Sequence, residues 1–157
     1  MRRLPSLSVR NAQRKRAVDV PSLQQFAERA CELCRETKSD GQNELEHLDE
    51  VTIVLVADRR IAALHQQFMN IDGPTDVLTF HHGEVFVSVE TAERNAAEFG
   101  TTAEDEMRLY IVHGLLHLRG FDDVDPEEAR RMSSVQERIL AAAAATAVTR
   151  PAGPAPV

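Results

Sequence analysis

The chain has 157 residues, the length of about one domain, with 43% hydrophobic and 27% charged residues. A domain of this size buries about 70% of its unfolded surface, so it needs neither disulfides nor a metal merely to fold. No apolar run approaches the ~18 residues of a membrane span. The net charge of -7 excludes a surface that is basic throughout. We therefore expect a cytoplasmic protein without a membrane partner, in which any metal is functional.

The first sixteen residues are basic, and no acid precedes Asp19. Such a start is found in organellar transit peptides and in arms that contact phosphates. It lacks the apolar core of a secretory signal, and residues 7–9 have the character of a short strand between solvated charges. We predict this strand, flanked by the cations Arg2, Arg3, Arg10, Arg14, Lys15 and Arg16.

A helix is expected from Pro21 to Cys34, because apolar residues recur there every three or four positions. Cys31 and Cys34 lie on or beside its apolar face. A C-x-x-C pair can serve redox chemistry or form half of a zinc knuckle, but the sequence has no second pair. We predict that both thiols pack in the core.

Three stretches have the composition of strands. Residues 51–56 (VTIVLV) show almost no polar alternation, which predicts a central strand buried on both faces. Residues 75–80 and 84–89 are two more strands, and the short connection between them suits an antiparallel hairpin. His81 and His82 in that connection are alternative metal ligands, although loop histidines are commonly solvated.

Two helix starts are marked by aspartates. Asp58 is expected to cap a helix with three inward residues, Ile61, Leu64 and Phe68. Asp125 and Pro126 open the last helix. This helix fades into a Pro/Ala-rich tail, residues 146–157, which we predict to be disordered.

The helix that begins at the capping box Thr102–Asp105 carries two histidines four residues apart. His113 and His117 therefore lie on one face and can bind a single ion. Gly120 is the expected stop, because glycine accepts the left-handed conformation that reverses the chain. The reversal brings back carboxylates that can complete a metal site, namely Asp122, Asp123 and Asp125.

Three motifs occur in order along the chain: PTDVLTF at 74–80, GEVFVS at 83–88 and HGLLHLRGFDD at 113–123. They resemble P-T-D-V-L-S-F, G-D-I-V-I-S and H-G-x-L-H-L-x-G-Y-D-H of the YbeY family, metal-dependent endoribonucleases associated with ribosomal RNA maturation. The resemblance covers roughly residues 51–140. It implies an α+β fold in a single domain over residues 1–145, with a small mixed β-sheet of about four strands, about five helices and the metal-binding helix in the core.

The resemblance also implies one zinc ion bound by His113, His117 and Asp123. Asp123 stands where the family has its third histidine, Met69 where it usually has an arginine, and Gly73 where it has a lysine. Two neutral imidazoles and one carboxylate give a site charge of about +1 instead of about +2. Each departure thus removes positive charge or a neutral ligand from the neighbourhood of an anionic substrate.

The expected function is that of a zinc-dependent endoribonuclease acting on single-stranded RNA in ribosomal RNA maturation and ribosome quality control, with reduced activity. Its expected partners are ribosomal RNA and the small ribosomal subunit or assembly factors. Two alternatives remain: a metal-dependent hydrolase of another substrate, such as a zincin-like peptidase, and a metal-stabilised ribosome-assembly factor without catalysis.

The residues available for chemistry bear on these alternatives. Gly114 stands where a zincin has its general-base glutamate, which disfavours peptide cleavage. His113 is the candidate for proton transfer if the metal is absent, since one nitrogen cannot both bind zinc and carry a proton. Positive charge for RNA is expected from the amino-terminal segment or from Arg59, Arg60 and Arg119.

We predict that Met69→Arg and Asp123→His each raise cleavage of an unstructured RNA, and that the double variant raises it further. An arginine on a phosphoryl transition state contributes on the order of 10³-fold in favourable cases, and less at an exposed site. Cleavage rates are compared at equal zinc occupancy. Unchanged activity in all three variants, with zinc and RNA bound, would favour another substrate or a non-catalytic assembly role.

Overall fold

Residues 4–148, which the computed structural model describes, form a mixed sheet with strand order β1-β2-β4-β3. β2 (Glu50–Val56) lies between β1 (Ser6–Asn11) and β4 (Glu84–Ser88) and runs parallel to both. β3 (Val77–Phe80) pairs with β4 in an antiparallel hairpin. The central strand, the hairpin and the α+β fold class predicted from the sequence are confirmed.

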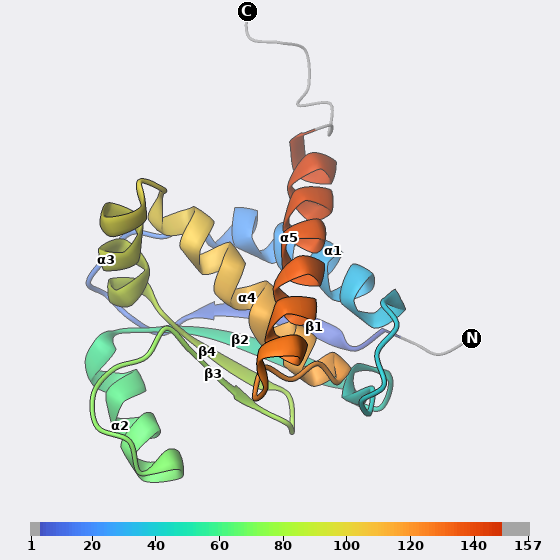
Figure 1. Ribbon diagram of the computed structural model, residues 1–157. Helices are drawn as coiled ribbons and strands as arrows, with labels where there is room; N and C mark the ends of the chain where they lie inside the picture. Colours follow the sequence, from blue (N-terminus) through green and yellow to red (C-terminus); the bar gives the residue numbers. More distant parts are fainter. Residues whose placement is uncertain (1–3, 149–157) are drawn as a thin grey trace, which may run out of the picture.

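Helices cover both faces of this sheet (Figure 1). Ile53 and Leu55 of β2 belong to the larger core, whereas Val54 and Val56 pack on the other face. Both sets are buried, which explains why β2 lacks polar alternation. A 3-10 turn, η1 (Glu44–Glu46), precedes β2. The helices are α1 (Val20–Glu36), α2 (Asp58–Met69), α3 (Val89–Phe99), α4 (Ala103–Arg119) and α5 (Pro126–Val148).

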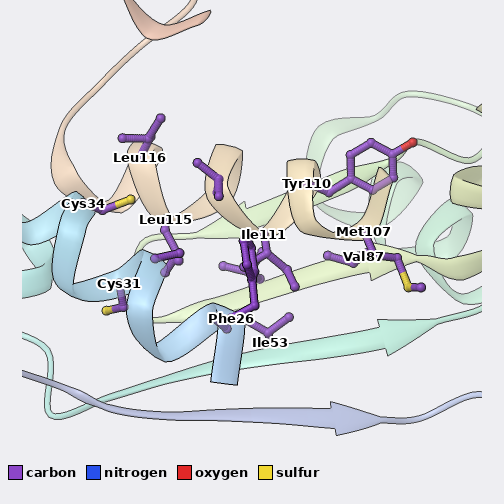
Figure 2. Close-up of a cluster of buried hydrophobic side chains, with 14 of the residues drawn as sticks. Phe26, Cys31, Cys34, Ile53, Val87, Met107, Tyr110, Ile111, Leu115 and Leu116 are labelled. Carbon is purple, nitrogen blue, oxygen red and sulfur yellow. The ribbon is translucent and has the colours of Figure 1, made fainter. Parts of the chain in front are cut away.

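The large core is built around α4. Figure 2 shows apolar side chains of α4 and α1 packed over β2 and β4, and the thiols of Cys31 and Cys34 lie among them. Burial raises the pKa of Cys31 to about 12, so this thiol stays protonated. The predicted core packing of both cysteines is confirmed.

α2 packs alone on the other face, and two expectations about it are wrong. Ala57 is its N-cap, and the Asp58 side chain instead accepts hydrogen bonds from Ser88 and Thr91 and pairs with Arg94. Burial alone would raise the pKa of Asp58, but these bonds outweigh it and hold the pKa below its usual value. Phe68 does not face inward: it is 58% exposed and contacts the ring of Phe80 edge-on.

The predicted tail begins at residue 146, but α5 continues to Val148. Residues 149–157 lie outside the described residues, as do Arg2 and Arg3. The strand predicted at residues 7–9 is present and longer: β1 covers residues 6–11. Part of the basic segment therefore belongs to the sheet. Within residues 4–148, no helix has the length and apolar character needed to cross a membrane.

The turn after α4 is as predicted, with Gly120 left-handed at φ 115° and its N–H bonded to the carbonyls of Leu116 and His117. It also packs against the loop after α1. A Cβ atom at Gly120 would lie 2.7 Å from the carbonyl oxygen of Gln42. The turn therefore requires glycine for its conformation and for its close backbone contact.

We predict that Gly120→Ala lowers the free energy of unfolding by on the order of 3 kcal/mol, because a left-handed penalty and a backbone clash add. The matched control is Gly100→Ala. Gly100 caps α3 at φ 72° with no atom within 4 Å of an added Cβ, so about 1 to 2 kcal/mol is expected there. Urea unfolding measures both, and equal losses would contradict the contact with Gln42.

Candidate metal centre

Two imidazoles meet on the half-buried side of α4. His113 and His117 lie one helical turn apart, and their Nε2 atoms are 3.1 Å from each other. Their side chains are 28% and 22% exposed. The two nitrogens are therefore accessible from one direction, while the rest of α4 is held in the core.

Asp123 completes the group. The chain reverses at Gly120, and Oδ2 of Asp123 comes to 3.5 Å from Nε2 of His113 and 3.9 Å from Nε2 of His117. Within the described part of the chain, this is the one set of three His, Cys, Asp or Glu side chains whose ligand atoms lie within 4.8 Å of one another.

The alternative ligands that the sequence left open have other partners. Asp122 Oδ1 accepts from the backbone N–H of Asp123, and Asp125 Oδ1 accepts from that of Glu128 at the start of α5. The two histidines of the hairpin connection also lie outside the group. The nitrogens Nδ1 of His81 and Nε2 of His82 contact carboxylates of Glu44 and Glu84.

Hydrogen bonds determine which nitrogen of each imidazole carries the proton. Nδ1 of His117 lies 3.1 Å from the carbonyl oxygen of Phe121, which can only accept, so this nitrogen donates. Nδ1 of His113 lies 2.9 Å from Oε1 of Gln136 on α5 and donates in the same way. Both Nε2 atoms therefore present lone pairs. Gln136 carried no signal in the sequence, because it lies 23 residues from His113 on a different helix.

The centre of the group thus holds three acceptor atoms and no proton donor: two Nε2 atoms and Oδ2 of Asp123. Such atoms repel one another unless a cation lies between them. Imidazole nitrogen and carboxylate oxygen are a donor set for divalent zinc. Burial lowers the pKa of His117, and His113 lowers it further although Asp123 opposes this. A lowered pKa keeps the imidazole neutral, which is the form that binds metal.

Gly114 lies on the opposite side of α4 from solvent, against the sheet. A Cβ atom there would lie 2.6 Å from Cγ1 of Val85 and 3.1 Å from Oγ1 of Thr79. No larger side chain fits without movement of β3 or β4, and one that did fit would extend toward the sheet. The position that carries the general base in zincins therefore cannot supply one here.

The arginines expected to attract RNA lie on two different helices, α4 and α2. Arg119 is half-buried, and its Nε donates to the carbonyl oxygen of Thr37 at 2.6 Å. Arg59 and Arg60 lie in the first turn of α2, a helix that packs on the other face of the sheet. Met69 ends α2 and is 55% exposed. Arg119, the arginine nearest to the histidines in sequence, is therefore held by a backbone carbonyl, and Arg59 and Arg60 lie on the other face of the sheet.

Comparisons with known proteins agree with this architecture. Residues 8–144 match the family model described as endoribonuclease YbeY. The endoribonuclease YbeY of Heliobacterium modesticaldum is 40% identical over 112 residues, covering 58% of this chain and 68% of that protein. That of Frankia alni is 34% identical over 130 residues, covering 68% and 72%. The solution structure of TM1509 from Thermotoga maritima has a TM-score of 0.64 at 26% identity, covering 96% of this chain and 99% of that one.

Proposed function

This chain belongs to the YbeY endoribonuclease family, and we propose that it cleaves single-stranded RNA with the help of a zinc ion bound by His113, His117 and Asp123. We further propose that its substrate is ribosomal RNA, cleaved in maturation and quality control on the small ribosomal subunit. The observation that carries the metal proposal is the convergence of three acceptor atoms with no donor between them.

The hydrogen bonds of the two Nδ1 atoms support the same assignment. Metal-binding histidines donate their other ring N–H to a carbonyl or carboxylate, which orients the ring and raises its basicity. Both histidines do so here, His117 to the backbone of Phe121 and His113 to Gln136. The two contacts come from separate elements and aim both Nε2 atoms at one point.

When bound, a divalent zinc ion would supply Lewis-acid stabilisation of the charge that develops on the scissile phosphate. The protein residues hold and orient the site. His113 has Nδ1 engaged by Gln136 and Nε2 directed at the proposed metal position, so neither nitrogen is free to accept a proton from RNA. A proton-transfer role for His113 therefore applies to metal-free protein only.

The two alternatives are not equally supported. Peptide hydrolysis lacks its general base, because Gly114 faces Val85 and Thr79 in the sheet. A non-catalytic assembly role has more to favour it: Met69 and Gly73 lack the charge of the family residues, and Asp123 reduces the charge of the site. An RNA cleavage assay on metal-loaded protein separates this role from the proposed one.

We predict that protein purified without added metal contains zinc, and that chelator abolishes its cleavage of unstructured RNA while casein stays intact.

Asp123→Ala removes a proposed ligand and should weaken zinc binding by more than about 100-fold, with cleavage lost in parallel. Asp122→Ala is the matched control, one residue away and also exposed. Zinc content is measured by elemental analysis. Full zinc occupancy in Asp123→Ala, or cleavage that resists chelator, would contradict the assignment.

A separate prediction concerns Gln136. Gln136→Met leaves Nδ1 of His113 without an acceptor and should weaken zinc binding roughly 10- to 100-fold. Gln136→Glu keeps an acceptor at that place and should retain the affinity. Competition with a chromogenic chelator measures both. Equal zinc affinities of the two variants would show that the contact does not orient His113.

A further inference from the structure

A cavity of about 850 Å³ lies on the face of the sheet opposite the metal centre. Its floor includes Val54 and Val56 of β2 and Phe86 of β4, the strand residues that do not face α4. One wall is the end of β1 and the loop after it, and the other is the first part of α2. This face is open there because α2 packs on β3 and β4, away from β1.

Positive charge gathers around this cavity. Arg10 contributes from β1, Arg14 and Lys15 from the loop, and Arg59 and Arg60 from α2. In the part of the chain that the structure describes, none of the five forms an ion pair. The single acid in the lining, Glu84, contacts His82 at 2.6 Å. Five exposed cations with no acidic partner are unexpected in a chain of net charge -7, because like charges repel.

The loop that carries two of these cations is held in one conformation by a buried glutamine. Gln13 is 8% exposed. Its Nε2 donates to Oδ1 of Asn11 and to the carbonyl oxygen of Arg16, both at 2.8 Å. Its Oε1 accepts from the backbone N–H groups of Lys15 and Arg16, both at 2.9 Å. The charged side of the cavity is therefore built into the fold.

We propose that this cavity, the β1–α2 cavity, binds the phosphodiester backbone of single-stranded RNA. The proposal rests on the proposed function, which supplies RNA as the substrate. The five cations are exposed and come from three segments, an arrangement that suits several solvated phosphates in a row more than one enclosed anion. Phe86 is the one aromatic residue in the lining and is 8% exposed, so bases have no ring to stack on.

The position of the cavity determines its role. It lies across the sheet from His113 and His117, so the phosphates bound there are not the one that is cleaved. An RNA that binds the metal centre gains affinity from this cavity only if it is long enough to reach both faces of the sheet. The β1–α2 cavity therefore supplies sequence-independent affinity that the metal centre, with its carboxylate, lacks.

Binding is tested on the full chain carrying His117→Ala, which removes a proposed ligand and so separates RNA binding from cleavage. Anisotropy of a fluorescein-labelled unstructured RNA of about 20 nucleotides is measured between about 50 and 200 mM salt. Arg59→Gln/Arg60→Gln should weaken binding on the order of 10-fold and reduce the slope of log K against log salt by about 1.4, the value for two lost phosphate contacts. Arg14→Gln/Lys15→Gln should give the same result.

The matched control is Lys38→Gln/Arg138→Gln. It removes two exposed cations that line a different cavity, between α1 and α5, and should leave the slope unchanged. Arg59→Lys/Arg60→Lys should restore it. Equal effects of cavity and control variants overturn the proposal, as does displacement of the RNA by inorganic phosphate at constant ionic strength. RNA binding with the predicted slope but no cleavage by the parent chain would instead contradict the proposed function and leave the cavity assignment intact.

Discussion

The close packing of α4 against the hairpin is the constraint on which the proposed metal centre depends. At Gly114 the helix has no side chain, and an added Cβ would already overlap Val85. This contact sets both the distance and the rotation of α4 relative to the sheet. Because the imidazoles of His113 and His117 are one turn apart, the same rotation brings both of them to the open side. A glycine in a core helix weakens it, and here that cost is offset by the packing of the helix on β3 and β4.

The two ends of α4 are also fixed by specific contacts. Thr102 and Asp105 form a reciprocal capping box that fixes where the helix starts. Gly120 fixes where it stops, and its contact with the loop at Gly41 and Gln42 directs the following residues back toward the histidines. Asp123 therefore reaches the group through the backbone geometry of the turn. The carboxylate at this position makes a site of lower positive charge, and five cations of the chain line the cavity on the other face of the sheet.

The features predicted correctly from the sequence depend on residues that are close together in the chain. Each of these features is set by residues within a few positions of one another. They are the apolar run of β2, the short hairpin connection, the capping box and the left-handed Gly120. The two errors on α2 have a tertiary cause. Asp58 leaves the cap position because Ser88, Thr91 and Arg94 of a neighbouring segment offer stronger contacts. Phe68 touches the sheet only at the edge strand β3, through Phe80, and stays 58% exposed.

The partners of the histidines could not be predicted from the sequence. Gln136 becomes an acceptor for His113 only when α5 lies beside α4. No sequence pattern predicts that a glutamine on an amphipathic helix will contact a histidine of another helix. The cavity on the other face was hidden in the same way. Its cations come from two stretches of the sequence, residues 10–15 and 59–60, which are more than forty positions apart. The pairing of β1 with β2 brings the two stretches together.

The contact between Gln136 and His113 also bears on when the protein acquires its chemistry during synthesis. Chains emerge from the ribosome amino end first, and a domain folds as a unit. The sheet, α2 and the basic cavity are encoded before residue 90, whereas the orientation of His113 waits for a side chain at position 136. A chain that ended between residues 123 and 136 would thus carry all three proposed metal ligands without the contact that orients His113.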